Sequence, residues 1–277
     1  MDCIFCRKGN SFKTVEHVIP ESLGNVEHVL PKGVVCDACN NYFAVKVEKP
    51  LLEMPYFINL RQRNLIRSKK RRLVPDKVLF PHPQGGWAEV WIDEQGFILR
   101  SEDTHIASLI KEGKINSMII PTIPEVDYPN DVISRFLAKA ALESVAYYSF
   151  GKGPYTDDFI QQNNLDPLRE YARYGIGPFW PYHQRRIYTE EDRFVNTDIQ
   201  PGPYEILHEF DFLMIDYEHI YLALVIMGVE YVIRLNQPEI KTYQQWLAEN
   251  KGRSPIRRGK EYMVTKDKND GTQPDTI

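Results

Sequence analysis

All four cysteines of this chain fall within its first 39 residues, as two pairs of equal spacing. Cys3 and Cys6 form the first pair, and Cys36 and Cys39 form the second. Two C-x-x-C pairs can place four thiolates in a tetrahedron around one Zn²⁺ ion. The alternatives are four free thiols or two disulfides, and disulfides need an oxidising compartment. Because the start of the chain lacks the features of a signal peptide, we expect a cytoplasmic protein with a structural zinc site.

The charge of the chain is distributed unevenly. Residues 1–75 hold 13 Lys and Arg against 7 Asp and Glu, whereas residues 76–277 hold 21 against 31. We therefore expect the first part to bind a polyanion, and the acidic part to offer a surface for a protein partner or an oligomer contact. No apolar stretch approaches the roughly 20 residues that cross a bilayer, so we expect no membrane partner.

Composition and patterning together predict an α+β protein in four parts. We expect a zinc module over residues 1–60, a basic linker over 61–75, a mixed α+β domain over 76–250 and a disordered polar tail over 251–277.

The local patterns predict the elements within these parts. We expect extended segments over 13–18 and 34–36, a helix from a cap at Asn40 to Lys49, strands over 78–80, 88–92 and 97–100, helices over 131–150, 157–174 and 243–249, and strands turning at Gly228 between 204 and 235. Trp87, Trp91, Trp180 and Trp246 are expected in the core. Asp216, Glu218 and His219 are interpreted as polar positions of a hairpin.

Glu16-His17-Val18-Ile19-Pro20 lies between the cysteine pairs, and Asn40 follows the last cysteine directly. This arrangement resembles the zinc-knuckle branch of the HNH endonucleases over residues 3–48. The resemblance implies a ββα-metal fold, in which a hairpin and a helix hold one divalent ion beside a reactive histidine. It implies that His17 is the general base, and that Glu16 and Asn40 are ligands of a catalytic Mg²⁺ or Mn²⁺ ion.

The chemistry of these residues agrees with that resemblance. Hydrolysis of a phosphodiester needs a base that activates water and a cation that neutralises developing charge. Histidine has a suitable pKa, and carboxylate and amide oxygens suit hard ions. The chain departs from the family where Glu16 replaces the common Asp and Pro31 replaces the usual middle Asn. Asn25 or a backbone carbonyl is the alternative for orienting His17.

The predicted function is metal-dependent cleavage of DNA, and the resemblance suggests a role in restriction or phage defence. A zinc-stapled nucleic-acid adaptor that does not cut and an RNA-cleaving nuclease are the alternatives. Glu16 and His17 could also be a solvated strand edge, and Asn40 only a helix cap. His28 is interpreted as a loop residue.

A run of seven positive charges without a negative one follows the zinc module. We expect it to contact phosphates without reading sequence, and the alternative is a solvated linker. The run consists of Arg61, Arg63, Arg67, Lys69, Lys70, Arg71 and Arg72.

Overall fold

The computed structural model describes residues 2–8, 11–67, 75–93, 95–100, 103–149, 162–189, 192–195, 208–257 and 263–265. Helices and strands are mixed along the chain, as predicted for an α+β protein. The chain divides into two compact units: the first comprises residues 1–18, 27–47 and 128–277, and the second comprises 19–26 and 48–127. This division differs from the predicted one, because the chain returns to the first unit after residue 127.

The first unit begins with a short antiparallel hairpin and a helix. β1 (Glu16–His17) pairs with β2 (Val29–Leu30), and α1 spans Asp37–Phe43. The predicted strand at 34–36 is wrong, because these residues form a bend that leads into α1. The Val34 carbonyl oxygen accepts a hydrogen bond from Ile4 N (3.1 Å) in the first cysteine loop. The expected cap at Asn40 is also wrong, since Cys36 occupies the N-cap position.

The helix continues beyond its predicted end at Lys49. A π-helical segment, η2 (Ala44–Glu48), follows α1 and leads into α2 (Lys49–Leu52). The π segment shifts the hydrogen-bond pattern, so that Pro50 falls in the first turn of α2. A first-turn residue needs no N–H donor, and proline is therefore tolerated there.

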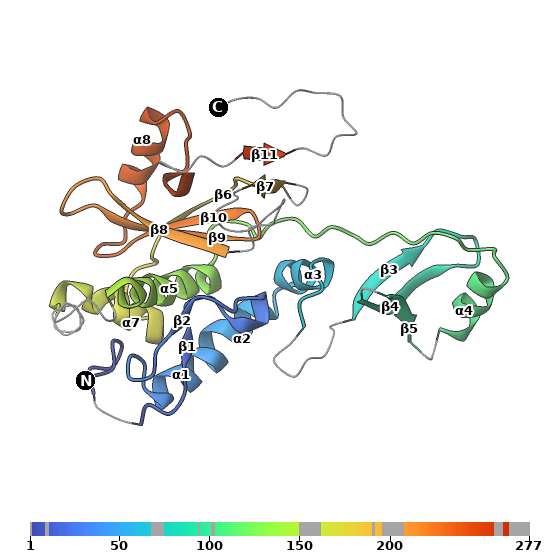
Figure 1. The fold of residues 1–277 in the computed structure, drawn as a ribbon, viewed down its shortest axis with the longest axis horizontal. Helices are drawn as coiled ribbons and strands as arrows, with labels where there is room; N and C mark the ends of the chain where they lie inside the picture. Colours follow the sequence, from blue (N-terminus) through green and yellow to red (C-terminus); the bar gives the residue numbers. More distant parts are fainter. Residues whose placement is uncertain are drawn as a thin grey trace. The chain divides into compact units, whose positions relative to one another are not determined.

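A four-stranded antiparallel sheet forms the core of the first unit, with the strand order β6-β10-β9-β8. Helix α5 packs near β10, and residues of α8 pack on the sheet's other side, so that the central strands lie between helices (Figure 1). This cover explains why β9 and β10 are buried almost throughout. The bounds of the elements are α5 (Asp131–Ser149), η3 (Asn163–Leu165), α7 (Asp166–Tyr174), β6 (Tyr182–Arg186), β7 (Arg193–Val195), β8 (His208–Met214), β9 (Ile220–Ile226), β10 (Val229–Arg234), α8 (Lys241–Glu249), η4 (Pro255–Arg257) and β11 (Met263–Thr265).

Most of these elements were predicted. The helices over 131–149 and 241–249 and the turn at Gly228 are confirmed, and the Oδ1 atom of Asn130 caps α5. Residues 157–161 of the predicted second helix lie outside the described residues, and α7 begins at Asp166 with a proline in its first turn. β11 lies within the predicted tail and pairs with β7, while residues 258–262 and 266–277 lie outside the described residues.

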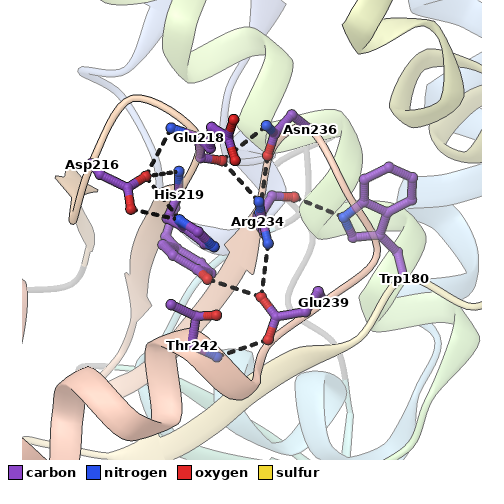
Figure 2. A network of polar contacts seen from close by, with 9 residues as sticks. Trp180, Asp216, Glu218, His219, Arg234, Asn236, Glu239 and Thr242 are labelled. Carbon is purple, nitrogen blue, oxygen red and sulfur yellow. Dashed lines mark hydrogen bonds and ion pairs between the residues drawn. The ribbon is translucent and has the colours of Figure 1, made fainter.

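A polar network fixes one end of this sheet (Figure 2). The buried guanidinium of Arg234 donates to Glu239 Oε2 (2.9 Å) and to the Glu218 carbonyl oxygen (2.9 Å). Asp216 Oδ1 accepts from the backbone N–H groups of Glu218 and His219, both at 2.8 Å. The hairpin interpretation of Asp216, Glu218 and His219 is therefore confirmed, and the turn is held by the side chains of Asp216 and His219 and by the backbone of Glu218.

The second unit contains α2 and a three-stranded antiparallel sheet in the order β3-β4-β5. The predicted strands are confirmed, whereas α3 and α4 were not predicted. The elements are η1 (Glu21–Leu23), α3 (Pro55–Arg63), β3 (Asp76–Phe80), β4 (Gly86–Asp93), β5 (Gly96–Leu99) and α4 (Thr104–Lys111). Among the described residues, no helix is long and apolar enough to cross a membrane.

Candidate zinc centre and catalytic hairpin

The four cysteines meet in one cluster. Their Sγ atoms all lie within 4.8 Å of one another, and those of Cys6 and Cys36 are 3.7 Å apart. A tetrahedral zinc ion with Zn–S bonds of about 2.3 Å places its sulfur ligands about 3.8 Å apart. The cluster therefore has the size and the donor set for one structural zinc ion. Within the described part of the chain, no other group of three His, Cys, Asp or Glu side chains is so arranged.

The electrostatics of the cluster favour a thiolate. The pKa of Cys3 is lowered to about 5, chiefly because the thiol of Cys39 donates a hydrogen bond to its sulfur. The backbone N–H of Cys36 also donates to this sulfur, at 3.4 Å. The thiolate is the form that ligates a metal, so the fold prepares Cys3 for this role.

Residues far along the chain hold the first cysteine loop. Asp166 forms an ion pair with Arg7 at 2.6 Å, directly after Cys6. The buried side chain of Arg169 donates from Nε to the Ile4 carbonyl oxygen at 2.8 Å. Both anchors come from α7, and no local pattern connects this helix with the cysteines.

Glu16 and His17 have different surroundings. Both lie on β1, where Glu16 is opposite Leu30 and His17 is opposite Val29. Successive residues of a strand point to opposite faces. Accordingly, the side chain of Glu16 is buried, at 5% exposure, whereas His17 is only partly buried.

Lys139 occupies the buried side of this hairpin. Its Nζ lies 2.9 Å from Glu16 Oε1, 2.8 Å from Glu143 Oε2 and 3.1 Å from the His17 carbonyl oxygen. Lys139 and Glu143 are fully buried. An ammonium group has three N–H donors, and these three acceptors match them. Lys139 therefore connects α5 to both residues of β1, and we name this cluster of Lys139, Glu16 and Glu143 the α5 staple.

The α5 staple gives the carboxylate of Glu16 an ammonium partner in a buried setting. The sequence carried a signal for the staple, because Lys139 interrupts the apolar face of the predicted helix and Glu143 follows four residues later.

Asn40 lies against the segment that enters β1. Its Nδ2 donates to the Val15 carbonyl oxygen at 2.7 Å and to Thr14 Oγ1 at 3.2 Å. The carbonyl can only accept, so the amide nitrogen faces it and the amide oxygen faces the other way. Asp37 supports the same segment, since its Oδ1 accepts from Lys13 N and Thr14 N, both at 2.9 Å. Hydrogen bonds from the hydroxyl groups of Ser11 and Thr14, followed by those from the backbone, lower the pKa of Asp37 to about 2.

The other predicted residues have varied positions. Arg61 is buried in α3 and burial lowers its pKa, so its side chain is not displayed on the surface as expected. Arg63 is half-buried and Arg67 is exposed. Asn25 donates its side-chain amide to the Ile19 carbonyl oxygen at 2.7 Å. Lys69, Lys70, Arg71 and Arg72 lie outside the described residues.

Comparison with known families agrees with this site. Residues 3–55 match the model of a family described as HNH endonuclease, and the matched segment contains the cysteine cluster and the hairpin. The predicted resemblance is thereby confirmed for this segment, and it indicates nuclease activity in general and a nucleic acid as the substrate. No curated protein and no solved structure matches the chain.

Proposed function

We propose that this protein is an endonuclease that hydrolyses phosphodiester bonds of DNA, with His17 as the general base. The observation that supports this most strongly is the cysteine cluster of zinc geometry inside the HNH-like segment, next to a hairpin that carries a partly exposed histidine. His17 would take a proton from the attacking water. A near-neutral pKa suits this task. A role in restriction or phage defence is part of this proposal and follows from the resemblance alone.

The proposal gives Asn40 and Glu16 separate tasks. The amide oxygen of Asn40 is the donor that would face a divalent Mg²⁺ or Mn²⁺ ion, which supplies charge neutralisation when bound. Glu16, the other predicted ligand, is instead assigned to the α5 staple, where it fixes the strand that carries His17. The backbone carbonyl of His17 is held by the same ammonium group.

A second candidate function is supported by the same staple. The Oε1 atom of Glu16 is paired with Lys139, and this engagement of a predicted metal ligand supports a zinc-stapled module that binds nucleic acid without cutting it. Such a module would need the basic run between Arg61 and Arg72 to bind nucleic acid, but it would not need His17.

One assay separates these candidates. The purified protein is incubated with supercoiled plasmid, linear duplex, single-stranded DNA and RNA, in the presence of Mg²⁺, Mn²⁺ or a chelator. The proposal predicts plasmid nicking that requires the metal ion. Loss of RNA alone would indicate the RNA-cleaving alternative, and retention of nucleic acid without any cleavage would support the binding module.

A further inference from the structure

The sheet of the second unit has one covered face and one open face. Residues of α4 and the segment after it pack on one side, against Val78, Phe80, Ala88 and Val90. Strand alternation places the intervening residues on the opposite side. We call this second side, which carries Lys77, Leu79, Trp87, Glu89 and Trp91, the outer face. Among the described residues of this unit, the core cluster that includes α4 packs only on the first side.

The register of the strands arranges the outer face in three rows. Ile119, Leu79 and Trp87 form one row through a β-bridge and a strand pair, and Trp91 lies opposite Ile98 in another. Trp87 is 61% exposed and Ile98 is 64% exposed. The expectation of a core position for Trp87 is therefore wrong.

Charged and polar groups run between the two apolar rows. Lys77 lies opposite Glu89, and Arg100 forms an ion pair with Glu89 at 2.8 Å. A depression of about 600 Å³ lies here, lined by Lys77, Trp87, Ala88, Glu89, Arg100 and Asp103. This volume is within the range of small-ligand pockets. It combines one exposed indole ring with both hydrogen-bond donors and acceptors.

We propose that the outer face binds single-stranded nucleic acid, with a base stacked on Trp87. Aromatic side chains on an open sheet bind bases because every base offers a π-face. Lys77 supplies positive charge for a phosphate beside the base, whereas the charge of Arg100 is paired with Glu89. Asp103 supplies an acceptor for an exocyclic amino group. The inference rests on the proposed function in taking a polynucleotide as the ligand.

The charges make a protein partner the weaker choice for this face. The centre of a protein–protein interface is depleted of Lys, Glu and Asp, whereas the middle row of the outer face consists of Lys77, Glu89 and Arg100. An ion pair that remains partly exposed suits a wet interface with a charged polymer. Binding by a protein is therefore kept as an outcome of the test.

The test measures binding of fluorescein-labelled single strands by anisotropy. The full-length His17→Ala protein, without added Mg²⁺ or Mn²⁺, is titrated at one fixed salt concentration into DNA and RNA strands of about 12 nucleotides. Trp87→Ala in this background is expected to weaken binding at least about tenfold, as for the loss of one stacked base. Trp87→Phe, which keeps an aromatic ring, is expected to restore most of the affinity.

A matched control is Ile119→Ser, which removes an exposed apolar side chain from the same face without removing a π-surface. Its affinity is expected to stay within about twofold of the parent. Equal affinities of the Trp87→Ala protein and its parent would overturn the inference. So would equal losses in Trp87→Ala and Ile119→Ser, or a Trp87-dependent dimer in light scattering without strand binding. Trp87-dependent binding, together with a wild-type protein that cleaves no nucleic acid in the presence of Mg²⁺ or Mn²⁺, would overturn only the proposed function.

Discussion

Neighbouring residues of β1 have opposite roles in this protein. Glu16 points to a buried lysine, and His17 lies on the other side of the strand with partial exposure. The adjacency of Glu16 and His17 in the sequence motif suggests that both side chains act on one phosphate. Strand alternation and the position of Lys139 separate them.

Glu16→Gln distinguishes a staple residue from a metal ligand. The amide keeps the shape of the side chain but gives Lys139 a weaker acceptor, so the free energy of unfolding should fall by about 1–3 kcal/mol. The Mg²⁺ concentration that gives half-maximal cleavage should not change. Urea unfolding and a Mg²⁺ titration measure the two effects, with Glu21→Gln, an exposed residue of η1, as the control. Unchanged stability together with a raised Mg²⁺ requirement would assign Glu16 to the ion instead.

His28 should contribute to the pH dependence of stability. Its ring lies edge-on to Tyr147 and Phe210, with centroid distances of 5.8 and 4.8 Å, and burial lowers its pKa below 6.5. The unfolded chain then binds a proton more readily than the folded one, so stability falls as the pH drops below 6.5. The His28→Phe substitution keeps an aromatic ring at this position and removes the group that binds the proton.

Urea unfolding of the His28→Phe protein between about pH 7 and about pH 5 should therefore show a smaller loss of stability than the wild type. The same loss in both proteins would show that His28 does not titrate differently in the folded and unfolded chains.

Helix α5 holds the hairpin of β1 and β2 through Lys139. Lys139→Met should lower the free energy of unfolding by about 3–5 kcal/mol, because two buried carboxylates lose their cation. Lys49→Met is a matched control, since Lys49 also pairs with a glutamate four residues later, but on the surface. Its cost should be below about 1 kcal/mol. Similar costs for the two variants in urea unfolding would contradict the buried ion pair as a source of stability.

Comparison of the predicted and observed helices and strands shows which sequence patterns are sufficient to predict an element. The strands of the second unit and helix α5 follow from alternation and helical periodicity, because their side chains pack on one face. The strand at Val29–Leu30 and the start of α1 at Asp37 were not predicted. These short elements depend on tertiary contacts, such as the bond between Val34 and Ile4.

On the scale of the whole molecule, the HNH-like segment is not self-sufficient. Lys139, Asp166 and Arg169 lie more than 80 residues beyond the matched segment, and they hold the hairpin and the first cysteine loop. The clustering of the four cysteines was predictable, because spacing and residue type carry the information. The supporting residues were not, since only the fold brings α5 and α7 to them.

The isolated fragment of residues 1–60 should therefore bind zinc without forming a fixed tertiary structure. Removing α5 leaves Glu16 without Lys139, and removing α7 leaves Arg7 without Asp166. Cobalt substitution followed by absorption reports the thiolate site, and dispersion of amide NMR signals reports tertiary structure. A well-dispersed spectrum of the zinc-loaded fragment would contradict this dependence.

In the proposed function, a hairpin beside the zinc cluster presents His17 as the base of a nuclease. The most direct measurement is metal-dependent plasmid cleavage by the His17→Ala protein, alongside its zinc content and melting temperature. We predict a loss of cleavage of at least about 100-fold, as for a missing general base, with one zinc ion per chain retained and an unchanged melting temperature. Cleavage by the His17→Ala protein at the wild-type rate would contradict the claim.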